Sequence, residues 1–146
     1  ANGEIIKDRV TGYEWQRCSV GQAWDANTQT CAGTAGTYPM DTAMANWPAT
    51  AAWRLPTIAE LRSLVYCSTG TPILINMTLD YTSCAGAYQT PTIVSLAFPN
   101  TPRLFFLSSS PRDSDSWWAV AFTHGAVGMH YRGDTPLPVR LVRGGQ

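Results

Sequence analysis

The stretch WRLPTIAELRSLVY at residues 53–66 predicts the element around which the rest of the chain is built: an extended segment, a sharp turn and a helix. Pro56 disfavours the helical conformation at Leu55, so the chain is expected to be extended there. Thr57 followed by Glu60 matches the capping box, in which each side chain accepts a hydrogen bond from the other residue's backbone N–H. The helix therefore begins at about Ile58.

Beyond this start, apolar residues recur at helical spacing. They form one stripe that must bury against a core, made of Ile58, Leu61, Leu64 and Val65. Glu60, Arg62 and Ser63 are expected to point away from it. A capping box indicates structure and not chemistry, so this stretch predicts the fold and not an active site.

The size and composition predict a single domain over residues 1–146. A chain of this length buries roughly two-thirds of the surface that its unfolded form exposes. Charged residues make up only 14%, against about 25% in an average soluble protein, and six Trp are present. Since no run of about 20 apolar residues occurs, we expect no membrane insertion. The start lacks the features of a signal peptide, so we expect either a removed signal or a segment cut from a longer protein.

The charge is balanced overall but unevenly distributed. The formal net charge is zero, yet the C-terminal third is basic, with five Arg and three Asp among residues 101–146. Nine of the ten basic residues are Arg, whose planar fork suits bidentate contact with sulfate, phosphate or carboxylate. The alternative for any single Arg is pairing with a neighbouring Asp or packing of its stem.

The four cysteines predict two disulfides. Three pairings are possible, and the sequence alone does not choose among them. Spacing favours two local bridges, Cys18–Cys31 and Cys67–Cys84, each of which closes a loop with little core of its own. A zinc site is the weaker alternative, because no C-x-x-C motif and no nearby His occur. Disulfides indicate an oxidising location, either secreted or on a cell surface.

The order of predicted elements indicates an α+β domain. Residues 4–8 and 13–18 predict an N-terminal hairpin, residues 21–38 a surface loop, and residues 68–92 an irregular, disulfide-tied region. Asp41 is expected to cap a short helix that ends near Trp47, before Pro48. Strands are expected at residues 93–98, 104–109, 117–122, 126–131 and 137–143, with Arg140 and Arg143 at the rim of the last one.

Several phrases together resemble one bacterial family. They are WRLPTIAELRSLV, the FPNTP of residues 98–102, the SSSP of residues 108–111 followed by Trp117-Trp118, the PVRLVRG of residues 138–144, and the opening DRVTGYEWQRC of residues 8–18. The chain resembles the C-terminal domain of the Legionella collagen-like adhesin over nearly its whole length. That family is similar to the C-type-lectin-like superfold, which also includes the formylglycine-generating enzymes. The resemblance implies a lectin-like α+β domain whose first and last strands pair. It also implies a homotrimeric adhesin, because collagen-like proteins have three chains.

Catalysis and metal binding are not expected. No H-E-x-x-H or G-x-S-x-G motif occurs, and the chain lacks the spaced reactive cysteines of the formylglycine-generating enzymes. Calcium-dependent lectins use an acidic-Pro-Asn phrase and a Trp-Asn-Asp phrase. Here Phe98 precedes Pro99-Asn100, and Trp-Asn-Asp is absent. We expect no enzyme activity and no cofactor.

What remains is metal-free binding of sulfated glycosaminoglycans or other anionic glycans, by Arg forks beside aromatic rings. The candidate ligand-binding residues are Arg103, Arg112, Trp117, His124, His130 and Arg132. Zero net charge opposes strong polyanion binding, whereas a trimer would repeat a small positive patch. We expect no nucleic-acid partner. The alternative function is a protein-binding or trimerisation module without glycan binding.

Overall fold

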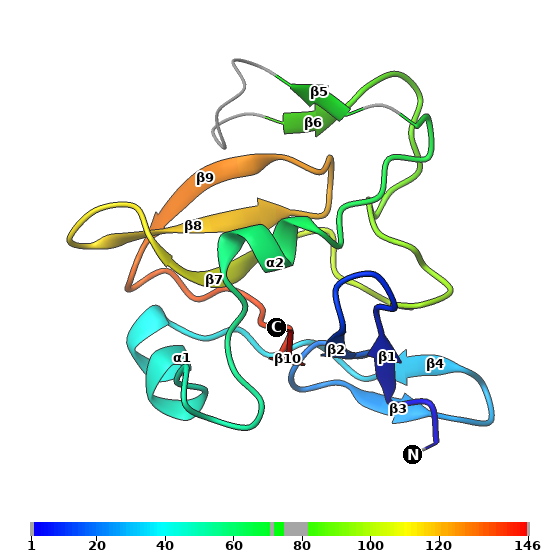
Figure 1. Cartoon of the computed structure of the whole chain (residues 1–146), viewed down its shortest axis with the longest axis horizontal. Helices are drawn as coiled ribbons and strands as arrows, with labels where there is room; N and C mark the ends of the chain where they lie inside the picture. Colours follow the sequence, from blue (N-terminus) through cyan, green and yellow to red (C-terminus); the bar gives the residue numbers. More distant parts are fainter. Residues whose placement is uncertain (1, 71, 75–81, 146) are drawn as a thin grey trace.

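The computed structural model describes residues 2–70, 72–74 and 82–145, without the side chains of residues 72–74, 82, 83 and 128–131. Within this part, two short helices, α1 (Met40–Asn46) and α2 (Ile58–Arg62), accompany three antiparallel sheets (Figure 1). The predicted α+β class is confirmed. No helix in the described part is long and apolar enough to cross a membrane.

A three-stranded sheet joins the two ends of the chain in the order β1-β2-β10, with β1 at Ile5–Lys7, β2 at Tyr13–Gln16 and β10 at Val142–Gly144. The predicted N-terminal hairpin is confirmed, and its turn contains Gly12 at a φ of 78°, which favours glycine. The final strand pairs with β2 and not with β1, which differs from the expected pairing of first and last strands. Both terminal strands nevertheless belong to one sheet.

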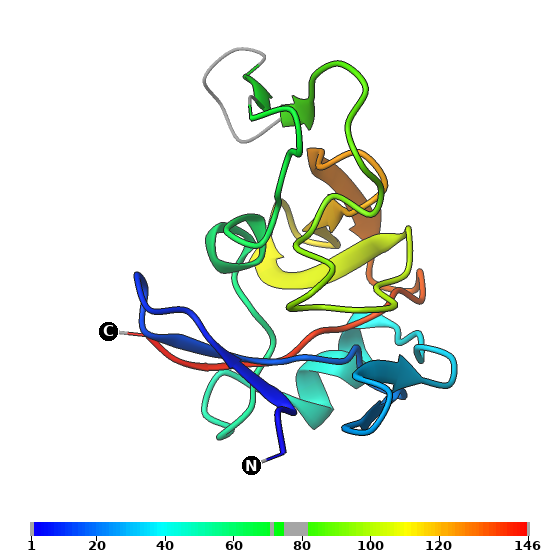
Figure 2. The same cartoon turned by 90° about the vertical axis from the view of Figure 1, so that its right-hand side faces the viewer.

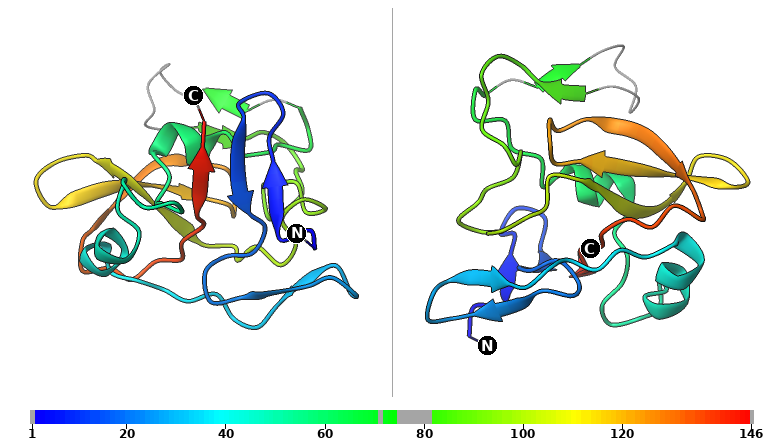
Figure 3. Two further views of the ribbon diagram at one scale, coloured as in Figure 1. Left: turned by 60° about the horizontal axis from the view of Figure 1, so that its bottom comes forward. Right: turned by 180° about the vertical axis from the view of Figure 1, so that it is seen from behind.

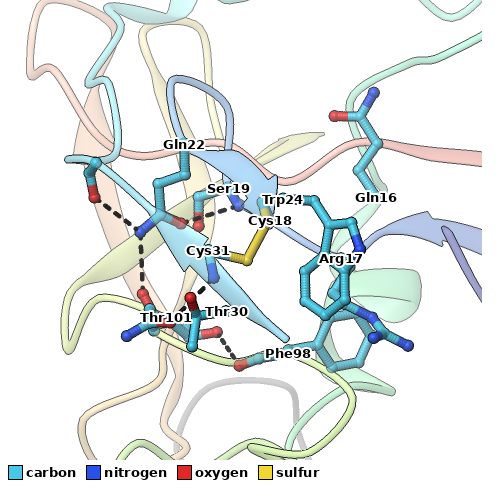
Figure 4. The surroundings of a disulfide bond; sticks show 12 residues. Gln16, Arg17, Cys18, Ser19, Gln22, Trp24, Thr30, Cys31, Phe98 and Thr101 are labelled. Atoms are coloured by element: carbon cyan, nitrogen blue, oxygen red, sulfur yellow. Dashed lines mark hydrogen bonds between the residues drawn. A yellow bond between two sulfur atoms is a disulfide. The ribbon is translucent and has the colours of Figure 1, made fainter. Parts of the chain in front are cut away.

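The region predicted to be a loop, residues 21–38, contains a hairpin of β3 (Ala23–Asp25) and β4 (Thr30–Ala32). The prediction of a loop was wrong here, because the backbone of this polar segment pairs without a periodic apolar pattern. The disulfide between Cys18 and Cys31 is confirmed and ties this hairpin to the end of β2 (Figure 4). The second predicted disulfide, Cys67–Cys84, is confirmed as well.

The largest sheet has the order β5-β6-β9-β8-β7. Its strands are β5 (Pro72–Leu74), β6 (Thr82–Cys84), β7 (Phe105–Pro111), β8 (Ser116–Ala121) and β9 (Val127–Arg132). Three of these were predicted, whereas β5 and β6 lie in the region predicted to be irregular. The views in Figures 2 and 3 show this sheet lying over the terminal sheet, with α2 against its β7–β8 part.

Two other strand predictions need correction. Residues 93–98 form turns, in which the backbone N–H groups of Ala97 and Phe98 both donate to the carbonyl of Val94. Leu96 points into solvent at 92% exposure, so its apolar character misled the prediction. Of the strand predicted at residues 137–143, only the end pairs as β10, and Leu137 makes an isolated bridge to Tyr38.

Helix α2 begins at Ile58, as the capping box predicts. The Thr57 hydroxyl accepts from the N–H of Glu60 at 3.3 Å, and the Glu60 carboxylate accepts from the N–H of Thr57 at 2.8 Å. Glu60 does not point into solvent as expected. It is buried and accepts both prongs of the Arg54 guanidinium, each at 2.8 Å. Burial alone would raise the pKa of Glu60, but the bonds from Arg54 and Thr57 outweigh it and lower the pKa.

Helix α1 starts without the predicted Asp41 cap. Pro39 occupies the N-cap position, no side chain caps the helix, and Asp41 lies in the first turn. The backbone N–H of Met40 instead donates to the carbonyl of Gly133 at 2.8 Å, in the turn after β9. This bond joins α1 to the large sheet.

The core has two apolar clusters, one on each face of β7 and β8. The α2 side contains Trp15, Ile58, Leu61, Ile93, Phe98, Phe106, Val120, Phe122, Val127 and Val142, with Leu64 and Val65 packed against it. The predicted α2 stripe is thus confirmed as core. The α1 side contains Met40, Ala43, Leu55, Leu107, Ala119, Leu137, Val139 and Leu141.

Candidate functional site

The structure removes Arg140 from the set of surface arginines. This side chain was expected at the rim of the last strand, but it is 0% exposed. Its guanidinium donates to the carbonyls of Gln16 and Arg17 and to the hydroxyl of Thr101, the last at 2.9 Å. It also lies 4.8 Å from the ring centroid of Phe98. Burial lowers the pKa of Arg140 to about 9, so the group is still protonated at neutral pH.

Arg143 lies at the expected rim of the last strand, but its side chain is engaged in contacts within the domain. Its Nε donates to the Glu14 carboxylate at 2.6 Å, and its guanidinium lies 4.6 Å from the ring centroid of Trp53. The arginines in the closing segment therefore serve the fold.

Three predicted ligand-binding residues meet at one end of the large sheet. Arg112 lies in the loop between β7 and β8, and Arg132 ends β9 opposite Ser116, next to Trp117. Trp117 and Arg132 line an open hollow of about 320 Å³ with Gly133. The Arg112 guanidinium lies 5.6 Å from the ring centroid of Trp118, a cation–π contact. The yellow loop in Figure 1 marks this end of the sheet.

Carboxylates outnumber the cations at this hollow. Asp41, Asp115 and Asp134 line it together with Arg132, and Asp113 lies 3.8 Å from Arg112. Two Arg against four Asp give this end a local formal charge of −2. An acidic field of this kind opposes polyanions, so the hollow is a poorer sulfate site than its arginines alone indicate.

The remaining described candidates, Arg103 and His124, lie at the opposite end of the same strands. The Thr123 hydroxyl donates to the carbonyl of Arg103 at 2.9 Å, and the rings of Phe105 and His124 meet edge to face with centroids 6.3 Å apart. The Arg103 side chain is exposed, and its guanidinium donates to the carbonyl of Thr90 at 3.4 Å. The segments at this end, residues 84–105 and 121–127, contain no Asp or Glu.

His130 belongs to β9, where its backbone pairs with Trp118. Its side chain lies outside the part that the structure describes. The five described candidates therefore form two separate groups, and the segments that carry Arg103 and His124 contain no Asp or Glu of their own.

A third feature was missed at the sequence level. Trp24, Trp47 and Trp53 come from three separate segments and line one groove of about 520 Å³ beside the Cys18–Cys31 disulfide. No local motif joins these residues, since Trp47 and Trp53 lie 23 and 29 positions after Trp24.

Among the described residues, no group of three or more His, Cys, Asp or Glu side chains is arranged to hold a metal ion.

The family model of the Lcl C-terminal domain matches residues 4–143. The chain belongs to this family, the C-terminal domain of Legionella collagen-like protein. Searches of curated proteins and of solved structures find no match. The similarity to the C-type-lectin-like superfold therefore stays a prediction.

Proposed function

We propose that this Lcl-type domain is the adhesive module of a secreted or surface-attached collagen-like protein, and that it binds sulfated glycosaminoglycans without catalysing a reaction. Family membership suggests the adhesin-like role, and the two disulfides are compatible with an oxidising location. Arg103 is the principal contact in this proposal, and His124 lies beside it.

The observation that carries the proposal is the absence of carboxylates from the segments around Arg103. Since these two segments supply no negative charge, they do not oppose the approach of a sulfate to the Arg103 guanidinium. The contact of Arg103 with Thr90 uses one N–H of five, so further donors remain for the ligand.

Arg112 and Arg132 are secondary contacts in this proposal. The four neighbouring Asp weaken their attraction for sulfate, so each contributes less than Arg103 does. A homotrimer would offset the small size of each patch, because three copies bind one long polyanion together.

Heparin affinity tests the proposal, measured at low and at about 150 mM salt for the parent, Arg103→Ala and the double variant Arg112→Ala with Arg132→Ala. Lys7→Ala is the matched control, because Lys7 is an exposed cation on strand β1 of the terminal sheet, outside the proposed site. We expect Arg103→Ala to weaken binding about fivefold, equivalent to about 1 kcal/mol, and the control to have no effect.

The proposed heparin-binding residues are wrong if neither Arg103→Ala nor the double variant changes the affinity for heparin. The function is wrong if the parent binds no sulfated glycan. Binding that ignores salt would also contradict an electrostatic contact at the surface.

One observation favours the alternative, a trimerisation or protein-binding face. Three exposed apolar side chains lie close together, those of Tyr66, Val94 and Leu96. They lie next to a hollow of about 300 Å³ that is lined mainly by apolar residues. Three other large apolar side chains, those of Trp24, Trp47 and Phe105, are half-buried and less available for such contact. Leu96→Asp should lower the sedimentation coefficient of a trimer held by this face. A parent that sediments as a monomer at tens of micromolar would exclude the trimer.

A further inference from the structure

The groove beside the Cys18–Cys31 disulfide has the features of a sugar site, and they are unlike those of the two Arg ends. Its wall comes from the terminal sheet, the start of β3 and the two sides of the connection between α1 and α2. At about 520 Å³, it falls within the size range of small-molecule sites. Three of the six tryptophans line it, which is a large aromatic surface for a single groove.

Each indole is held in place by a contact of its own. The Arg17 guanidinium lies 4.4 Å from the ring centroid of Trp24, and the Trp24 N–H donates to the carbonyl of Asn2 at 2.7 Å. Trp47 meets Tyr38 edge to face, with centroids 5.1 Å apart. Arg143 lies against Trp53 in the same way as Arg17 does against Trp24. All three indoles remain half-buried, so they are fixed but still partly open to a ligand.

This arrangement reduces the entropy that a ligand must overcome on binding. Rings that already have a defined orientation lose little freedom when a flat ligand face stacks on them. The disulfide next to the groove restrains the β3–β4 hairpin that carries Trp24. The site is therefore preformed and not assembled by the ligand.

The polar groups of the groove suit hydroxyl groups and not sulfates. The side-chain amide of Gln16 lines it and has no hydrogen-bond partner within the described part, and Figure 4 shows this amide pointing away from the disulfide. The carboxylate of exposed Glu4 also lines it. Among the described residues, no Lys, Arg or His is in the lining itself. Arg17 and Arg143 lie against the indoles, and Arg143 is paired with the Glu14 carboxylate. An acceptor carboxylate and a free amide bond hydroxyls, whereas the carboxylate repels an anion.

We propose that this groove is a second glycan site, which binds the uncharged pyranose rings of an oligosaccharide. The apolar faces of the sugar rings stack on the indoles of Trp24 and Trp53, and the hydroxyls bond Gln16 and Glu4. This site is separate from the Arg103 end and binds without electrostatic attraction, so its affinity is independent of salt. The domain then recognises two chemically different glycans through two surfaces.

Tryptophan fluorescence and amide NMR spectra of the whole domain test this, with chitohexaose, cellohexaose and maltohexaose as uncharged probes. We expect at least one probe to shift the indole N–H signals of the groove and to bind equally at low and at about 500 mM salt. Gln16→Leu should weaken this binding about two- to tenfold, the loss expected for one or two hydrogen bonds. Trp24→Ala should weaken it about tenfold or more.

Gln89→Leu is the matched control, since it removes an exposed amide from outside the groove, and it should leave the affinity unchanged. Gln16→Leu replaces a half-buried side chain by one of similar size, so the variant is expected to fold even if Trp24→Ala does not. Arg103→Ala should leave this binding unchanged while it weakens heparin binding, which separates the two proposals.

Three results would overturn the second site. One is the lack of any shift with all three sugars at 10 mM. Another is binding that Gln16→Leu and Trp24→Ala both leave unchanged. The third is a decaproline peptide that shifts the groove signals when the sugars do not, because the groove would then bind a proline-rich chain.

Discussion

Replacing Arg140 tests how a buried cation supports this fold. The guanidinium is fully buried, and within the described part no carboxylate lies within ion-pair distance of it. Carbonyls and hydroxyls accept hydrogen bonds from its two terminal nitrogens, whereas its Nε has no partner in the described part. The rings of Phe98 and Phe106 lie 4.8 and 5.8 Å from the guanidinium. These groups connect the end of β2, the 98–101 turn and the closing segment.

The change in the free energy of unfolding for each Arg140 variant depends on lost hydrogen bonds, on the relieved desolvation of the charge and on any cavity that is left. Arg140→Met nearly keeps the volume, loses charge-assisted hydrogen bonds worth about 1.5–3 kcal/mol each, and removes a desolvation penalty of several kcal/mol. We expect the free energy of unfolding to change by less than about 2 kcal/mol. Arg140→Ala adds a cavity, so it should be about 2–5 kcal/mol less stable than the Met variant. Arg140→Lys keeps the charge but loses the planar fork, and should cost about 3 kcal/mol or more.

Urea unfolding at pH 7 with both disulfides intact, followed by tryptophan fluorescence, measures these differences. The expected order of stability places the parent and Met variants above the Lys and Ala variants. A Lys variant as stable as the parent would show that a point charge suffices. An Ala variant within 1 kcal/mol of the Met variant would show that the side chain is not packed as described.

Further predictions concern the α2 cap, the crosslinks and the response to pH. Glu60→Gln should lower the free energy of unfolding by about 2–3 kcal/mol at pH 7, because it leaves Arg54 without its partly buried counterion. Since the pKa of Glu60 is lowered on folding, its contribution is present above the unfolded value of about 4.3 and is lost as the pH falls through the folded one. Acid unfolding curves should therefore be shallower for Glu60→Gln, and equal slopes would contradict this. Replacing either cysteine pair by serine should cost about 3 kcal/mol in thermal or urea unfolding, and only the loss of Cys18–Cys31 should also weaken neutral-sugar binding.

Features encoded within a few residues could be predicted from the sequence. The capping box at Thr57 and Glu60 and the turn at Gly12 depend on neighbours three to five positions away. The two disulfides were predicted from spacing, because each closes a short polar loop. These signals do not need the tertiary fold.

Features that depend on distant contacts could not be predicted. Arg140 is buried because Gln16 and Thr101, 124 and 39 positions away, converge on it. Arg103 and Arg132 were both candidates in the sequence, and only the fold shows that Asp41, 91 positions away from Arg132, lines a hollow with it. The tryptophan groove likewise needs three segments to meet.

The central claim is that an anionic glycan binds at Arg103, at the end of the large sheet where residues 84–105 and 121–127 contain no Asp or Glu. The most direct test is the arginine Nε–H NMR spectrum of the labelled domain during titration with a heparin tetrasaccharide at low salt. We predict that the Arg103 signal shifts most, that those of Arg112 and Arg132 shift less, and that the signal of buried Arg140 stays in place. The account would be contradicted if the Arg103 signal stayed in place while other arginine signals shifted strongly, or if no arginine signal shifted at all.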